Sequence, residues 1–392
     1  MSQPSSIART LRRPVENAES VESVALLGGA AIFILGALVG TVFFWGRNAA
    51  ISGPNSLGAF VAIGAGFVAL VAFIAGRLLL RSGSARHEHT PILDDLRAGL
   101  HVRNRLDVPG AKLHWFDIAA LALAHAFIAL LGWIGLADLL ERSFIGAVVY
   151  TLPAAVLAGV ALAVSSYVVF LSAVNLTPML LSLVLALFLV VGALASMLSS
   201  SDPHWWKKNL SALGMTDDVS ALAFNVTLII AGVIVTTIAH YATATIPVRT
   251  PAEVKGRNRV RFALIVIGVC LTCVGVFPVD RFFLLHNTVA TGMTVVYAVM
   301  VVGIRWLVPA MPRVFILLGY VFVGVIAVLA VFFAIGYYNL TAVELVAAVL
   351  IFGWIIVFLR NTSAMRPAAV TDETGTTDVS HLAGPASAPA EL

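Results

Sequence analysis

Charged side chains are scarce in this chain of 392 residues. Only 11% of the residues are Asp, Glu, Lys or Arg, and 60% are hydrophobic, whereas soluble domains carry about 25% charged residues. A soluble protein of this length could not hide so much apolar surface from water, so lipid must surround much of the chain. The composition therefore excludes a soluble globular protein. We expect membrane lipids, and no nucleic acid, as partners.

Cysteine is almost absent. The two cysteines, Cys270 and Cys273, fall inside one apolar run and on one helix face, so the sequence implies no disulfide framework. Redox chemistry needs access to a thiolate, and the centre of a bilayer disfavours that charge. We expect both side chains to act as small apolar packing groups.

Spacings typical of metal sites are also lacking. No His-x-x-x-His or similar pattern joins the metal-binding side chains expected on the outer side, which are His204, His286, Asp202, Asp280 and Glu344. His125 and His240 could lie at similar depth on two helices, but a single pair gives little support for a haem. We therefore expect no metal and no cofactor.

Long apolar runs are abundant. Strand-like alternation is weak, and the lengths fit helices rather than the strands of a β-barrel. A spanning helix needs roughly 20 apolar residues. On that basis the predicted spans are 24–46, 57–80, 116–137, 144–172, 178–198, 219–244, 262–279, 288–306, 314–337 and 342–359. The first run is too long for a signal peptide and no clear cleavage site follows it, so we expect it to be retained. The sequence predicts an all-α, polytopic transmembrane helical bundle of about ten spans.

The distribution of basic residues orients these spans. If the N-terminus is cytoplasmic and the spans alternate, all but five of the 24 Lys and Arg residues lie on the cytoplasmic side. The five exceptions are Arg47, Arg142, Lys207, Lys208 and Arg281. Basic residues in short loops stay in the cytoplasm, so both termini are predicted to be cytoplasmic. We expect a multi-pass protein of the cell membrane, in the cytoplasmic membrane of a bacterium.

Composition divides the chain into four parts. We expect a cytoplasmic N-terminal tail at 1–23 and a four-span region at 24–172 that contains a basic cytoplasmic loop at 81–113. A six-span region follows at 178–360, and a disordered cytoplasmic tail at 361–392. The last tail has no apolar periodicity and is rich in Thr, Ala, Pro and Gly, a composition typical of segments that cannot bury a core.

A polar loop at 201–218 interrupts the apolar runs on the predicted outer side. Trp205 and Trp206 suit the membrane interface, where an indole keeps one face apolar and its N–H wet. Lys207 and Lys208 follow them and could meet a lipid phosphate. The alternative is membrane anchoring alone. Asn225 follows in the next span, where a buried amide must find hydrogen-bond partners.

A second polar stretch, GVFPVDRFFLLHN, begins at Gly275. Pro278 is expected to end a span, and Asp280 and Arg281 to occupy a very short outer loop before His286. Asp280 could share a hydrogen bond with His286 and orient its imidazole; the alternative is a capped hairpin with no further role. Glu344 closes a Thr-x-x-Glu sequence that resembles a capping box at the start of the last span.

The stretches NLSALG and AFNVTLIIAG, followed by GVFPVD and LHN, resemble the bacterial membrane family called domain of unknown function 998. More remotely, they are similar to the DRAM-like membrane proteins of eukaryotes and to relatives that act in GPI-lipid remodelling. The residues that carry the resemblance are Ser211, Gly214, Phe224, Asn225, Gly232, Gly275, Pro278, Asp280 and His286. The resemblance covers residues 178–360. It implies a helical membrane bundle with polar motif residues near the outer face, and no established reaction.

Three functions remain open from the sequence. The first is binding of a lipid or amphiphile at the extracytoplasmic face, and the second is a lipid-modifying enzyme with His286 as general base oriented by Asp280. The third is a small-molecule transporter, for which the chain shows no clear internal repeat. The residues expected to bind a ligand are Trp205, Trp206, Lys207, Lys208, Ser211, Asn225, Asp280, Arg281 and His286.

Overall fold

The computed structural model describes residues 18–87, 114–215, 217, 219–244 and 246–364. Within these ranges the chain forms ten long α-helices and two 3-10 helices, η1 and η2. The helices are α2 (Ala18–Phe43), α3 (Leu57–His87), α4 (Trp115–Ser143), α5 (Thr151–Val174), α6 (Pro178–Ser199), η1 (Trp205–Lys207), η2 (Leu210–Gly214), α7 (Val219–Ala244), α8 (Pro251–Val276), α9 (Phe283–Leu307), α10 (Arg313–Ala334) and α11 (Leu340–Ala364). All ten α-helices are long and apolar enough to cross a membrane. The predicted all-α polytopic bundle is confirmed.

Several helices extend beyond the predicted boundaries. α2 begins at Ala18, α3 continues to His87 and α11 to Ala364, so the parts of the predicted tails and basic loop nearest the spans are helical. Polar residues at a membrane surface can continue a helix because their side chains stay in water, and hydropathy alone therefore ends it too early. The rest of these segments, 1–17, 88–113 and 365–392, lies outside the described residues.

Two predicted span starts, those of α8 and α5, were wrong. α8 begins at Pro251 rather than at 262, because Thr250 accepts a hydrogen bond from the backbone N–H of Glu253 and proline occupies the first turn, a strong helix start. The fourth span begins at Thr151 rather than at 144. Residues 144–150 instead form a loop in which Val149 exchanges backbone hydrogen bonds with Ala49.

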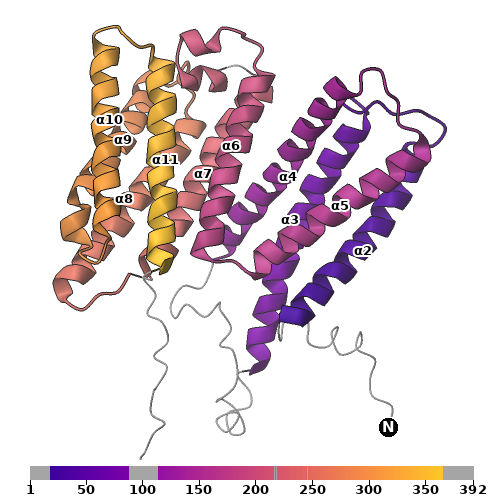
Figure 1. Ribbon diagram of the computed structural model, residues 1–392, viewed down its shortest axis with the longest axis horizontal. Coiled ribbons are helices and arrows are strands. Elements are labelled where there is room, and N and C mark those ends of the chain that lie inside the picture. Colours follow the sequence, from indigo (N-terminus) through magenta and orange to yellow (C-terminus); the bar gives the residue numbers. More distant parts are fainter. Residues whose placement is uncertain (1–17, 88–113, 216, 218, 245, 365–392) are drawn as a thin grey trace, which may run out of the picture.

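The helices pack as two groups. α3 packs on α4, and α5 packs on both α2 and α3, whereas α6 to α11 form the second group. α4 joins the groups through contacts with α6 and α7, and the hydroxyl of Thr237 donates to Asp117 across this contact at 2.9 Å. Figure 1 shows that the groups diverge toward the upper end of the view.

Glycines bring α7 and α8 into close contact. A Cβ added at Gly232 would lie 2.4 Å from the backbone oxygen of Gly268, and one at Gly268 would lie 2.6 Å from the oxygen of Gly232. Thr236 and Thr272 each lie one turn after these glycines and pack on the opposing helix. Small residues of this kind allow membrane helices to approach along their backbones, so this crossing holds α8 in place.

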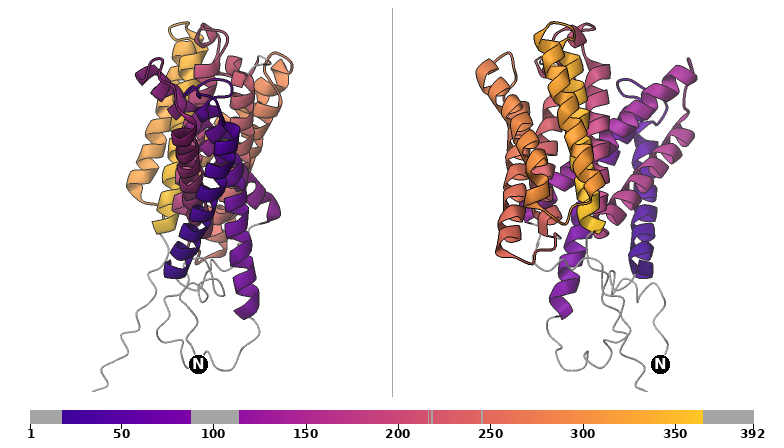
Figure 2. Two further views of the ribbon diagram at one scale, coloured as in Figure 1. Left: turned by 90° about the vertical axis from the view of Figure 1, so that its right-hand side faces the viewer. Right: turned by 60° about the vertical axis from the view of Figure 1, so that its left-hand side comes forward.

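Five helix connections, including the longest one that the structure describes, lie at one end of the bundle, which we call the loop end. Figures 1 and 2 show the loops there at the top, while α2 starts and α11 ends at the bottom. The connections at the loop end are 44–56, 144–150, 200–218, 277–282 and 335–339. The two polar stretches singled out in the sequence therefore lie at the same end.

Candidate functional site

Three connections of the second helix group meet at the loop end, and we call their meeting point the loop junction. Among the described residues it comprises 200–215, 217, 277–287 and 339–344. Asn339 donates its side-chain amide to the backbone oxygen of Trp206 at 3.1 Å, and Arg281 pairs with Asp217 at 3.0 Å. The polar loop and the second polar stretch thus contact each other directly, although Asp217 and Arg281 are 64 positions apart in the sequence.

His286 occupies the centre of the loop junction and is 3% exposed. Its Nδ1 lies 2.7 Å from the backbone oxygen of Phe277, and its Nε2 lies 3.0 Å from Oγ of Ser211. A carbonyl oxygen only accepts, so Nδ1 carries the proton, and in the neutral imidazole Nε2 accepts from the serine hydroxyl. The ring is therefore fixed in one tautomer with a serine hydroxyl on its basic nitrogen.

The expected bond between Asp280 and His286 is not present. α9 begins at Phe283, five residues before the predicted start, so His286 lies in the first helical turn and its backbone N–H donates to Phe282. Asp280 stays in the preceding turn, where its carboxylate lies 4.0 Å from the guanidinium of Arg281. The group that orients the imidazole is the carbonyl of Phe277, at the C-terminal end of α8.

Glu344 does not form the expected capping box either. Asn339 caps α11 instead, since its side-chain oxygen accepts from the backbone N–H of Ala342 at 3.0 Å. The carboxylate of Glu344 extends to η2, where it accepts from the backbone N–H of Leu210 at 2.5 Å and also from that of Ser211. Glu344 thereby positions the short helix that carries Ser211.

Asn225 finds its partner in the same junction. Its amide donates to the backbone oxygen of Gly214 at 3.1 Å, and a Cβ at Gly214 would lie 2.5 Å from its Oδ1. A Cβ at Gly275 on α8 would lie 2.6 Å from the backbone oxygen of Asn225. η2 therefore approaches the side chain of Asn225 closely, and α8 approaches its backbone, because glycine occupies both contact positions.

The basic residues at the junction differ in their partners. Lys208 forms an ion pair with Asp202 at 2.9 Å, and this bond, with the N–H of His204, lowers the pKa of Asp202. Arg281 is paired with Asp217. Lys207 instead lies over the ring of Trp206, with 5.5 Å between its Nζ and the ring centroid. Trp206 is 47% exposed, whereas Trp205 is half-buried.

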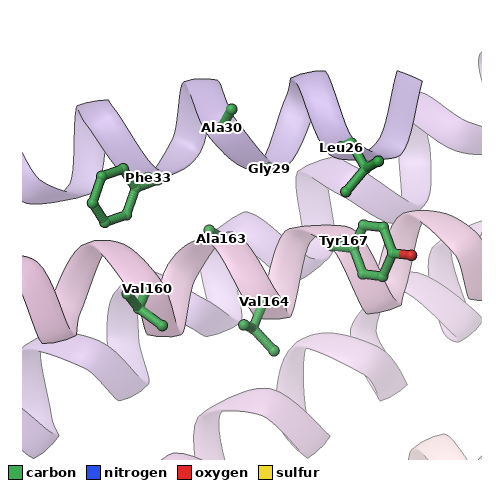
Figure 3. Close-up of a pocket in the computed structure, with 8 residues that line it drawn as sticks. All are labelled: Leu26, Gly29, Ala30, Phe33, Val160, Ala163, Val164 and Tyr167. Atoms are coloured by element: carbon green, nitrogen blue, oxygen red, sulfur yellow. The ribbon is translucent and has the colours of Figure 1, made fainter. Parts of the chain in front are cut away.

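Two hollows lie in the first helix group, away from the predicted site residues. One, of about 290 Å³, lies between α2 and α5 and is shown in Figure 3, with Phe33 and Tyr167 at its two ends. The other, of about 490 Å³, lies between α2 and α3. Neither hollow could be predicted from the polar residues of the sequence, because both are lined almost wholly by apolar side chains.

The described residues hold no group of three or more His, Cys, Asp or Glu side chains that could bind a metal. His125 is engaged by the backbone oxygen of Leu121 at 2.7 Å and by Oγ of Ser172 at 2.8 Å. This arrangement repeats that of His286 and Ser211, but it lies inside a membrane span.

No protein-family model, curated protein or solved structure matches the chain.

Proposed function

We propose that this multi-pass integral membrane protein binds a lipid or another amphiphile at the loop junction, with the headgroup on the segment Trp205–Lys208. The observation that carries the proposal is the pair formed by Lys207 and Trp206. In the described part of the chain Lys207 has no carboxylate partner, and its ammonium lies over an exposed indole. The ammonium can bind the phosphate of a lipid headgroup. The indole beside it can contact the upper part of the acyl chain.

The neighbouring cation provides a matched control. The ammonium of Lys208 forms an ion pair with Asp202, so it should bind a phosphate more weakly than the ammonium of Lys207. Purified protein would be titrated with phosphatidylglycerol and bound lipid counted by native mass spectrometry. We expect Lys207→Ala to weaken binding about fivefold, since a basic residue near a membrane surface contributes about 1 kcal/mol. Lys208→Ala should have a smaller effect, and equal effects or none would contradict the proposal.

The side of the membrane is part of the proposal. We propose that the loop end is extracytoplasmic and that the membrane is the cytoplasmic membrane of a bacterium, because alternation of the spans assigns all but five of the 24 basic residues to segments of the other side. A periplasm-active reporter fused near Asn209 should be active, and a cytoplasm-active one silent. The reverse pattern would overturn the assignment.

The hydrogen bond between Ser211 and His286 favours a second candidate, hydrolysis of a lipid ester. Ser211 Oγ would attack the ester carbonyl carbon while its proton passes to Nε2 of His286. The bond between that carbon and the leaving oxygen breaks, and the leaving alcohol takes the proton from His286. Water, deprotonated by the same nitrogen, then releases the fatty acid and regenerates the serine.

The hydrolase candidate has a control built into the chain. Ser172 bonds His125 in the same way, but within a span. A fluorophosphonate probe should label Ser211 in the folded protein, and His286→Asn should reduce that labelling while Ser172 stays unlabelled. If Ser211 reacts no faster than exposed Ser199, the pair is a structural link between η2 and α9 and the hydrolase candidate fails.

We also propose membership of the family called domain of unknown function 998. Four of the residues that carry the resemblance form two direct contacts in the junction: Ser211 with His286, and Gly214 with Asn225. The first contact joins the two distant stretches of the motif, and the second joins the two parts of its first stretch. Alanine at Ser211 or at Asn225 removes one of these bonds to η2, so each variant should show faster amide hydrogen exchange in η2. Unchanged exchange in both variants would mean that the motif residues do not act together.

A further inference from the structure

The hollow between α2 and α3 has the form of a groove with a floor and one closed end. Both helices pack along α5 but make few contacts with each other, so α5 forms the floor between them. The glycines Gly36 and Gly64 face this floor from the two walls. A Cβ at either would lie within 2.9 Å of the side chain of Leu162, which shows that the glycines make room for this leucine.

The groove has the length of one leaflet. Its wall on α2 extends from Ile32 to Phe43, which at 1.5 Å per residue is about 16 Å, and the hydrocarbon core of a bilayer is about 30 Å thick. Its volume of about 490 Å³ lies within the range of ligand pockets. At the loop end the ring of Phe43 meets that of Phe60, with 5.0 Å between centroids, and closes the groove.

Polar groups suited to a phosphate lie at this closed end. The exposed guanidinium of Arg47 lies 4.8 Å from the centroid of the Phe43 ring and gives two of its donors to the backbone oxygen of Phe43, so others remain for a ligand. Asn55 lines the end of the groove with a left-handed backbone, φ 57°. The carboxylates of Asp138 and Glu141, near the end of α4, accept hydrogen bonds from Ser52.

We infer that this groove binds one acyl chain of a phospholipid, whose phosphate lies against Arg47 and Asn55. The walls are membrane spans, so the chain comes from the surrounding leaflet through the open side. A basic residue at the end of an apolar groove of leaflet length matches the distribution of charge and hydrocarbon in a phospholipid. This site is separate from the one at the loop junction and does not depend on it.

The test uses a phosphatidylglycerol with a photoactivatable diazirine in its acyl chain, reconstituted with the full chain in vesicles. Peptide mapping should place cross-links on the groove walls, in particular near Ile63. Ile63→Trp, at a side chain that is 67% exposed, should reduce them about tenfold. The indole would fill the space that the acyl chain occupies, so the chain could no longer lie along this part of the groove.

Two controls keep the result specific. Leu183→Trp alters an equally exposed position on α6 (62%) and should leave the groove cross-links unchanged. Arg47→Gln should reduce labelling by the phospholipid probe but not by a diacylglycerol with the same diazirine chain. Equal labelling of α3 and α6 would mean bulk lipid contact only, and it would overturn the inference, as would insensitivity to Arg47→Gln.

Discussion

The crossing of α7 and α8 offers the sharpest test of how the loop junction is held. In Gly268→Ala the new Cβ would lie 2.3 Å from Oγ1 of Thr236 and 2.6 Å from the backbone oxygen of Gly232. The threonine hydroxyl can rotate at the cost of its own bond to Gly232, but the carbonyl is part of the helix. Relief therefore requires the two helices to separate.

The size of this separation follows from the distances. Ordinary contact begins at 3.4 Å, so α8 must move by about 0.8 Å at this point to clear the carbonyl oxygen at 2.6 Å. Overpacking of this kind costs about 1–3 kcal/mol. Because α8 ends at the carbonyl that orients His286, and Gly275 packs against Asn225, the displacement should extend to the loop junction.

Gly353→Ala is the matched control, since a Cβ there would meet no atom within 4 Å. Both changes replace glycine by alanine within a spanning helix, so any gain in helix propensity is common to both variants. The difference between their Tm values therefore reports the effect of packing alone. Thermal unfolding in detergent can be followed with a thiol-reactive dye, because the only cysteines, Cys270 and Cys273, lie in α8. We expect Gly268→Ala to have a Tm several degrees lower than Gly353→Ala, since about 1 kcal/mol corresponds to roughly 2–4 °C in domains of 150–250 residues.

Two outcomes would contradict this reasoning. If Gly268→Ala and Gly353→Ala unfold at the same temperature, α7 and α8 do not approach as closely as described. If Gly268→Ala lowers the Tm but leaves hydrogen exchange of η2 unchanged, the crossing does not position the junction.

Two further predictions concern the polar groups of the loop junction. Glu344→Ala removes the acceptor of two backbone N–H groups of the half-buried η2 and should destabilise the protein by about 1 kcal/mol. Glu344→Gln keeps one carbonyl oxygen and should cost less, and equal losses in Tm would argue against this role. For Asp202, the bond from Lys208 lowers the carboxyl pKa below its ordinary value of 3.8, so its stabilising contribution is present at neutral pH and is lost only as pH falls through the lowered pKa. A carboxyl NMR titration should show this lowered pKa in the wild type and a value nearer 3.8 in Lys208→Ala; identical titrations would contradict the assigned cause.

Much of the fold could be predicted from the sequence because a bilayer imposes a simple rule. A span needs a long apolar run, and ten such runs gave ten helices. The uncharged connection between α5 and α6 could also be predicted, from the length of the apolar run and from Pro178, which opens α6 in the structure. Thr177 accepts a hydrogen bond from the N–H of Leu180 there. Boundaries were less certain, as at α8, because polar residues at the surface are compatible with either helix or loop.

The candidate site could be predicted only in part. Its two polar stretches could be identified because charged and amide groups are energetically unfavourable inside a membrane and therefore stand out among apolar runs. Alternation of the spans assigned both stretches to the same side. Which residues would bond could not be predicted. Asp280 and His286 are close in sequence, but the start of α9 at Phe283 turned the imidazole toward Phe277 and Ser211.

The sequence by itself determined that the chain holds ten runs long and apolar enough to cross a membrane and which connections between them carry basic residues, because hydropathy and charge are properties of each segment taken alone. Only the tertiary structure decided that Ser211 bonds His286, that Glu344 supports η2, and that a groove opens between α2 and α3. Those features depend on how helices far apart in sequence approach each other, and side-chain packing across several elements sets that approach.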